Sequence, residues 1–170
     1  MHSLGAGESK EEILQNPLAV MQVDFSTEEI PWSHGRDLYK LWLELKGDKP
    51  WPARRDFSLP RMSNYLEYII LIDVEQNPLD FVVRLCGTGH RPFMKFEPTG
   101  ASFSTTVNGP EYVARFEKLI ELGKPYIGVN QYIPWIEDPH MHHRRMHGIA
   151  LPLGNDDKTI NMMMLLAHYF

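Results

Sequence analysis

The chain has 170 residues, of which 43% are hydrophobic and 11% aromatic, enough for one domain with a hydrophobic core. Its 17 Lys and Arg residues are outnumbered by 22 Asp and Glu residues, and the net charge of -5 argues against a nucleic-acid-binding surface. No segment approaches the roughly 18 consecutive apolar residues of a membrane span. Residues 1–15 lack the apolar core of a secretory signal, and the single cysteine, Cys86, excludes an internal disulfide. We therefore expect a cytoplasmic protein without a membrane segment.

Residues 1–48 are interpreted as an N-terminal extension that ends in a helix. Ser9 and Glu12 have the spacing of a capping box, which predicts a short helix reaching about Gln15. Between Ser33 and Leu45, apolar residues recur at helical spacing. This pattern predicts an amphipathic helix with a broad apolar stripe.

Residues 49–170 form the second predicted unit. Apolar alternation and flanking turn residues predict five strands, at residues 68–74, 81–86, 126–135, 141–153 and 159–169. An irregular flap at 88–107 and an amphipathic helix at 110–122 separate the second strand from the third. This order indicates an α+β fold, a five-stranded antiparallel sheet with the flap and the helix on one face.

A series of short motifs carries a family resemblance. The motifs are Trp42, Pro52-x-Arg54-x-Asp56-Phe57, Leu71-x-Asp73-Val74, Arg84-Leu85-x-Gly87-Thr88, Glu97-x-Thr99-Gly100, Gly123-x-Pro125 and Leu151-Pro152-Leu153. In this order, from about residue 36 to residue 170, the chain resembles a PAS-like domain family of alphaproteobacterial single-domain proteins (the PAS_5 group). It departs from that family at Val83, where an aromatic residue is common, and at Lys95, where a glycine often lies. The resemblance implies a sensor-type, PAS-like fold for residues 49–170 and leaves the ligand open.

Two polar side chains in the predicted strands are candidate ligand contacts. The guanidinium of Arg84 can clamp a carboxylate, or it can form a structural salt bridge with Asp73 or Asp56 or face solvent. His147 lies where strand 141–153 passes from polar to apolar residues, on the parity that we expect to point inward. Its imidazole can bind a ligand or form an ordinary hydrogen bond within the core.

The flap supplies the other candidate walls of a ligand site, Phe93, Met94 and Phe96. Their apolar side chains beside the first strand pair predict a site beneath the flap, together with Arg84 and His147. The preceding Gly87-Thr88-Gly89-His90 does not match a phosphate-binding loop and predicts a turn.

Four histidines, His140, His142, His143 and His147, lie close together in the sequence. Imidazoles two residues apart on a strand can chelate a metal, which offers the alternative of a metal-dependent enzyme or metal-binding protein. No carboxylate or cysteine follows at a defined ligand spacing, so we assign no metal. His90 and His147 qualify as axial haem ligands by residue type alone, so no cofactor is assigned.

No nucleophile–base motif and no pair of carboxylates on a shared inward face is recognisable, and we therefore expect no catalysis. The first hypothesis is a cytoplasmic PAS-type sensory module. It would bind a small apolar or amphipathic ligand and pass the change to a signalling protein partner by contact. A further alternative is a pure dimerisation or interaction protein whose pocket is filled by its own side chains.

The last strand also bears on self-association. From Met162 onward it is apolar at both parities, so both sheet faces should be covered. The flap and helix 110–122 cover one face, and helix 33–45 is available for the other. Its stripe is broader than one sheet face needs, which predicts a two-fold homodimer. The alternative is that this helix folds fully onto its own sheet and the protein is a monomer.

Overall fold

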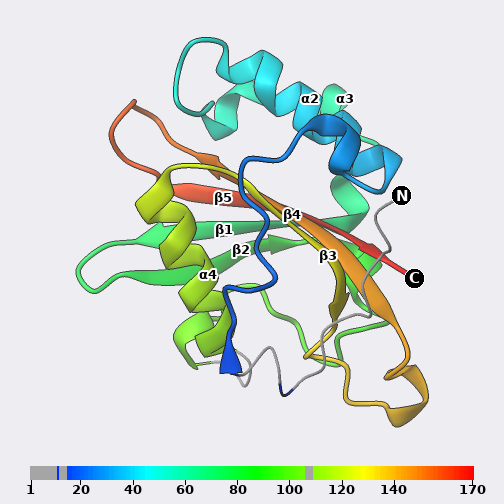
Figure 1. Cartoon of the computed structure of the whole chain (residues 1–170). Coiled ribbons are helices and arrows are strands. Elements are labelled where there is room, and N and C mark those ends of the chain that lie inside the picture. The colour runs from blue at the N-terminus through cyan, green and yellow to red at the C-terminus, as the bar shows by residue number, and fades with distance from the viewer. Residues whose placement is uncertain (1–10, 12–14, 106–108) are drawn as a thin grey trace.

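The structure, a computed structural model, describes residues 11, 15–105 and 109–170. It is built around five strands: β1 (Ile69–Glu75), β2 (Asp80–Cys86), β3 (Tyr126–Tyr132), β4 (Arg145–Leu153) and β5 (Met162–Tyr169). The strands lie in the order β2-β1-β5-β4-β3, and each neighbouring pair is antiparallel (Figure 1). This arrangement confirms the predicted α+β class and is consistent with a PAS-like fold.

Two helices of 14 residues, α2 (Ser33–Lys46) and α4 (Gly109–Leu122), pack on the sheet. Each lies within one residue of its predicted bounds, because the apolar residues at helical spacing face the sheet. A short helix, α3 (Leu59–Met62), carries a proline in its first turn. The 3₁₀ turns are η1 (Thr27–Glu29), η2 (Arg54–Asp56), η3 (Leu66–Tyr68), η4 (Thr88–His90), η5 (Phe103–Thr105) and η6 (Pro139–Met141). None of the described helices has the length and apolarity that crossing a bilayer demands.

Helix α4 and the flap cover one side of the sheet, here called the α4 face. The side chains of Phe81 on β2 and Phe116 on α4 are fully buried, and their ring centroids lie 5.3 Å apart. Phe103 of the flap packs edge-on against Phe116 at 5.1 Å. The flap and the long helix therefore share one face, as predicted.

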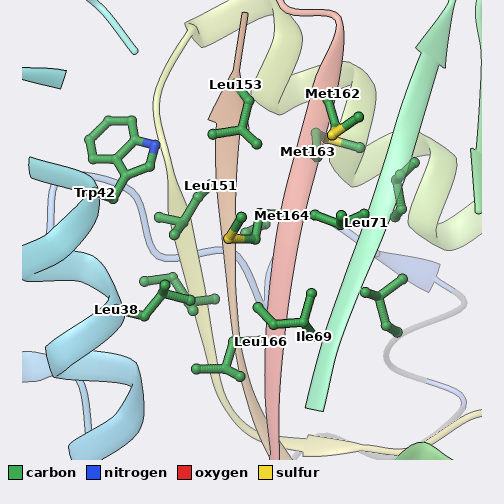
Figure 2. Close-up of a cluster of buried hydrophobic side chains, with 14 of the residues drawn as sticks. Leu38, Trp42, Ile69, Leu71, Leu151, Leu153, Met162, Met163, Met164 and Leu166 are labelled. Carbon is green, nitrogen blue, oxygen red and sulfur yellow. The ribbon is translucent and has the colours of Figure 1, made fainter. Parts of the chain in front are cut away.

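Helix α2 covers the opposite side, here called the α2 face. Its buried side chains Leu38 and Trp42 lie against β4, beside Leu151 (Figure 2). The indole Nε1 of Trp42 donates a hydrogen bond to the carbonyl oxygen of Pro152 at 3.0 Å. Both faces of the sheet are thus covered, which accounts for the apolar residues at both parities of β5.

The described part of the N-terminal extension joins the same core. Gln22 forms a two-hydrogen-bond bridge with Ile127 at the outer edge of β3, and Phe25 and Ile30 are buried in the main hydrophobic cluster. Residues on both sides of the predicted boundary at residue 48 therefore contribute to one core. The helix predicted from the capping box at Ser9 lies largely outside the described residues.

The start of β4 differs from the prediction. The strand begins at Arg145, whereas we predicted residue 141. The turn η6 occupies the preceding segment, because the Asp138 side chain accepts a hydrogen bond from the His140 N–H at 2.9 Å and Pro139 suits a first helical position. The strand alternation predicted for residues 140–144 was therefore wrong.

Two other strand ends are also corrected. β3 ends at residue 132 rather than 135, and β5 begins at residue 162 rather than 159. Before β5, the carboxylate of Asp156 accepts hydrogen bonds from the backbone N–H groups of Lys158 and Thr159. This local turn holds residues 156–159 out of the sheet.

Candidate functional site

A pocket of about 40 Å³ lies on the α4 face, between α4, the flap and the strands β1, β3, β4 and β5. Most of its wall consists of apolar side chains and the small residues of β4 and β5. The rest of the wall consists of five side chains that each carry a polar group: His90, Tyr112, Tyr126, Gln131 and Trp135. A mostly apolar hollow with a few converging polar groups is typical of a small-molecule site.

A β-bulge in β3 turns Gln131 toward the pocket. The register shifts between Gly128, which is opposite Gly148, and Gln131, which is opposite Met146. Within the bulge, Asn130 has a left-handed backbone with φ of 53°, a conformation that asparagine tolerates. Regular alternation from Gly128 would place Gln131 on the α2 face, so the extra residue decides its direction.

Gly128 and Gly148 make room for the Gln131 amide. A Cβ atom at Gly148 would lie 3.3 Å from Gln131 Nε2, and one at Gly128 would overlap the same amide. The two paired glycines thus form a shallow recess in the sheet surface, where Gln131 lies only 5% exposed.

The flap contributes a buried histidine to the pocket. His90, at the end of η4, is 1% exposed, and its Nδ1 lies 2.6 Å from the hydroxyl oxygen of Tyr169. Burial lowers the pKa of His90 to about 4, an effect that the Tyr68 carbonyl offsets only in part. The ring is therefore neutral near pH 7. Within the described part of the chain its Nε2 forms no hydrogen bond of good geometry, although the Tyr68 carbonyl lies close enough to the ring to raise its pKa.

Tyr112 and Trp135 add two more polar groups to the pocket wall. The Arg115 guanidinium lies close enough to the Tyr112 hydroxyl to lower its pKa by hydrogen bonding, and the Trp135 indole has the same effect on the Tyr169 hydroxyl, although neither contact has ideal geometry. Burial raises the pKa of Tyr112 to about 12, so its hydroxyl is protonated at neutral pH.

Directly behind the pocket wall lies a buried cation, Arg115, which is 2% exposed. Its Nε donates to the carbonyl oxygen of Pro17 at 2.7 Å, and its Nη1 donates to Gln131 Oε1 at 3.4 Å. Its guanidinium also lies over the ring of Tyr112, 5.1 Å from the ring centroid. Its Nη2 has no partner in residues 15–105 and 109–170.

Among the described residues, Arg115 forms no ion pair with a carboxylate. Glu111 precedes it by one turn of α4, but its buried Oε2 is without a partner there too. The two buried charges act on Tyr112 in opposite directions, since Arg115 lowers the pKa of its hydroxyl and Glu111 raises it.

The five ligand contacts predicted from the sequence do not come together in the structure. Arg84 occupies a bulge between β1 and β2, and its Nε donates to both carboxylate oxygens of Asp73 at 2.8 and 2.9 Å. Its side chain is 60% exposed. Arg84 therefore forms the structural salt bridge with Asp73 that was the predicted alternative to a ligand contact.

His147 lies on the α2 face, across the sheet from the flap. Its Nδ1 accepts a hydrogen bond from the backbone N–H of Asn130 at 2.9 Å, and its ring packs against Trp32 and Phe170. Burial, with a smaller contribution from His168, lowers the pKa of His147 to about 4. Its position is that of a hydrogen-bonded histidine in an aromatic cluster, and a ligand role stays a prediction.

The flap residues occupy three different environments. Phe93 stacks on Tyr169 with ring centroids 3.9 Å apart, which places it directly behind the His90–Tyr169 pair. Met94 is half-buried against the main core, whereas Phe96 is 50% exposed. None of the five predicted residues lines the pocket, and Phe93 is linked to the lining residue His90 through Tyr169.

The histidine-rich segment was the predicted metal alternative. His140 belongs to η6, and His142 and His143 lie between η6 and β4, so they do not share strand geometry with His147. Within the described ranges, no group of three or more His, Cys, Asp or Glu side chains is arranged to hold a metal ion.

The polar residues that line the pocket were not among the predicted ligand contacts. One signal was available for Arg115, because it occupies the apolar stripe of α4 with Tyr112, Phe116 and Leu119 at helical spacing. A cation in such a stripe is unusual and indicates a buried role. For Gln131 no comparable signal exists, because the strand alternation points it to the wrong face.

No known protein family, curated protein or solved structure matches the chain. Interpretation of the pocket therefore depends on its own residues.

Proposed function

We propose that the chain is a cytosolic PAS-type sensory module that binds a small molecule in the α4-face pocket and signals through protein contact. The observation that carries this proposal is the mostly apolar hollow of about 40 Å³ on the α4 face, whose wall includes His90, Tyr112 and Gln131. Apolar walls with a few polar groups are typical of a small-molecule site. The sheet order and the position of the flap support the PAS type.

The size of the pocket limits the ligand. One water molecule needs roughly 10–15 Å³ of such space, so about 40 Å³ accommodates about three waters or a molecule of three to four heavy atoms. A ligand of about four heavy atoms gains at most about 6 kcal/mol, which corresponds to a dissociation constant of tens of micromolar at best. Haem and flavin are far larger than this pocket.

Arg115 offers a physical route for the signal. Its Nη1 contacts the pocket residue Gln131, while its Nε holds the Pro17 carbonyl of the N-terminal segment. The same segment is hydrogen-bonded to the edge of β3 through Gln22. A ligand that moves the Gln131 amide alters its contact with Arg115 and so the hold on Pro17, and this shifts the population of the bound N-terminal segment.

We also propose that the protein forms a two-fold homodimer, with the outer surface of α2 and α3 as the contact. The buried stripe of α2 already packs on its own sheet, but Leu43 and Leu59 remain 37% and 65% exposed. A salt bridge between Arg61 and Glu44 at 2.8 Å holds the two helices side by side (Figure 1). The same surface would serve a signalling partner.

Size-exclusion chromatography with light scattering tests the dimer. We expect the mass of two chains at tens of micromolar, and a shift to one chain in Leu59→Glu. The mass of one chain for the unchanged protein would reject the dimer. A dimer that persists in Leu59→Glu and Leu43→Glu would reject this contact surface.

The ligand proposal is tested by ¹⁵N NMR with a panel of small polar fragments at millimolar concentration. We expect at least one fragment to shift the backbone amide signals of Gly148 and Ala167 saturably. The indole signal of Trp51 serves as an internal control, because that side chain is hydrogen-bonded to the Asp156 carbonyl rather than to the pocket.

Two variants reduce the space for a ligand. Ala167→Leu adds volume to the wall, and Gly148→Ala pushes against the Gln131 amide. We expect both variants to remain folded and to lose fragment binding. If no fragment causes a saturable shift in the unchanged protein, the alternative of an interaction protein with a self-filled pocket is favoured instead.

A further inference from the structure

We propose that His147 acts from the α2 face as a positioning residue for the α4-face pocket, because it holds the bulge of β3 that turns Gln131 into the pocket wall. The inference rests on the proposed function, since it concerns how the ligand site is built and how contacts on the other side of the sheet reach it. Its basis is a side-chain hydrogen bond at the place where the β3–β4 ladder is interrupted.

The interruption leaves two residues of β3 opposite one residue of β4. Between the paired positions 128 and 131, Val129 and Asn130 both lie opposite His147. The backbone N–H of Asn130 donates to His147 Nδ1 at 2.9 Å, so a side chain takes the place of a ladder carbonyl. The histidine therefore closes the bulge by supplying an acceptor that the interrupted ladder does not.

The ring of His147 is held in the state that this bond requires. Burial lowers its pKa to about 4, so the imidazole is neutral near pH 7, and acceptance at Nδ1 places its proton on Nε2. Its ring centroid lies 5.7 Å from that of Trp32 and 4.5 Å from that of Phe170. Aromatic neighbours on the α2 face thus fix the ring that fixes the bulge.

The bulge carries this constraint to the other face of the sheet. Asn130 has a φ of 53°, and the extra residue places Gln131 in the pocket wall. A regular strand would direct the Gln131 side chain to the α2 face. The amide in the pocket, with its contact to Arg115, therefore depends on an acceptor on the opposite side of the sheet.

Trp32 extends this series of contacts to helix α2. It directly precedes α2 and lies against Gly35 in the first turn, where an added Cβ atom would overlap the indole ring. The same indole stacks on His147. A change in the seating of α2, such as one caused by a partner on that helix, thereby acts on the bulge and on the pocket.

NMR of the ¹⁵N-labelled full chain measures the hydrogen bond and the direction of Gln131 separately. A scalar coupling between the backbone nitrogen of Asn130 and Nδ1 of His147 detects the bond. Nuclear Overhauser contacts from the Gln131 N–H₂ group to the α protons of Gly128 and Gly148 report its place in the recess. We expect both signals in the unchanged protein, and absence of the coupling would overturn the inference.

Variants at residue 147 separate the acceptor from the ring. His147→Phe keeps a ring but has no acceptor, whereas His147→Asn lacks the ring but carries Oδ1 at the position of Nδ1. We expect the Asn130 amide proton to exchange about tenfold faster in His147→Phe, with loss of the Gln131 contacts. His147→Asn should retain the slow exchange and the contacts. His168→Phe changes another ring of the same cluster and should also retain them.

Two results would overturn the positioning role. One is that the Gln131 contacts persist in His147→Phe, and the other is that they vanish equally in His147→Asn. If His147→Phe does not fold, His147→Leu replaces it, because leucine resembles asparagine in shape and has no acceptor.

The link to α2 has its own test. Gly35→Ala pushes on Trp32, so we expect it to move the backbone signal of Asn130 and the side-chain signals of Gln131. Lys40→Ala, on the exposed side of α2, is the control and should leave them in place. Unmoved signals in Gly35→Ala would overturn the link. None of these readouts needs a ligand, so a pocket that binds no fragment rejects the proposed function without deciding the role of His147.

Discussion

The guanidinium of Arg115 and the amide of Gln131 meet across the boundary between helix α4 and strand β3, with Nη1 3.4 Å from Oε1. This contact orients the amide, so that Nε2 is the amide atom nearest to both Gly128 and Gly148. It also joins the pocket wall to the N-terminal segment, since the same guanidinium binds the Pro17 carbonyl at 2.7 Å. One buried cation thus connects the candidate ligand site with the candidate output.

Gln131→Glu should convert this contact into an internal ion pair. A carboxylate at that position strengthens the hydrogen bond to Arg115, so we expect Gln131→Glu to be at least as stable as the unchanged protein at pH 7. Gln131→Met is the uncharged comparison, because it removes the acceptor of the buried guanidinium, and we expect it to lose about 1–3 kcal/mol. Urea unfolding measures both changes. Equal stability of Gln131→Met and the unchanged protein would show that the Arg115–Gln131 contact contributes nothing.

Tyr169→Phe should destabilise the fold. It removes the hydroxyl that lies 2.6 Å from His90 Nδ1 and leaves a buried ring nitrogen without a partner, at a cost of about 1–3 kcal/mol. Urea unfolding at pH 7 measures this free energy. Tyr39→Phe is the matched variant, because no hydrogen bond of that half-buried hydroxyl is found within the described residues and its removal should cost little. Equal stability losses in the two variants would show that the His90 hydrogen bond contributes nothing.

Stability should fall as the pH drops from about 6.5 toward 4. The pKa of buried His90 is lowered from 6.5 to about 4, so in this interval the unfolded chain binds a proton that the folded chain does not. The stabilisation is complete above pH 6.5 and is lost below the folded pKa. By pH 4.5 the loss from His90 alone amounts to about 2–3 kcal/mol. The pKa of His147 is lowered in the same direction and adds to the slope.

Urea unfolding of the unchanged protein, His90→Gln and His140→Gln at pH 7 and pH 4.5 isolates this effect. The fall in unfolding free energy should be smaller by about 2–3 kcal/mol in His90→Gln. His140 is exposed in the turn η6, so His140→Gln should follow the unchanged protein. The same pH dependence in all three proteins would show that His90 is not the buried titrating group.

Trp42→Ala should undock helix α2 from the sheet. The indole is 2% exposed and donates to the Pro152 carbonyl, so its loss creates a cavity and an unpaired carbonyl worth about 3–5 kcal/mol. The neighbouring Leu43 is 37% exposed, and Leu43→Ala should stay within about 0.5 kcal/mol. Chemical denaturation of both variants checks the difference. A small effect of Trp42→Ala would indicate that α2 is only loosely attached to its sheet.

The local pattern of the chain was sufficient for the main elements. Apolar residues at helical spacing predicted both α2 and α4 to within one residue, and alternation predicted the existence of all five strands. Strand ends were less predictable where a side chain reorganises the backbone, as Asp138 does in front of β4. The apolar residues at both alternating positions of β5 correctly indicated that both faces of the sheet are covered.

The candidate pocket was harder to predict from the sequence, because contacts between residues far apart in the chain form it. His90 and Tyr169 are 79 residues apart in the chain, and only the sheet and the flap bring them within 2.6 Å. His147 was predicted to share a site with Phe93, yet the sheet separates them, because the parity of a strand says which residues share a face and not which face carries the flap.

The sequence by itself therefore determined which segments are helix or strand, since these depend on local periodicity and on the burial of one apolar face or stripe. Only the tertiary structure decided which polar groups surround the pocket. Gln131 faces it because a single extra residue at Asn130 reverses the alternation of β3. Arg115 is held there by partners on a strand and on the N-terminal segment, and such pairings are set by sheet register and chain path rather than by local propensity.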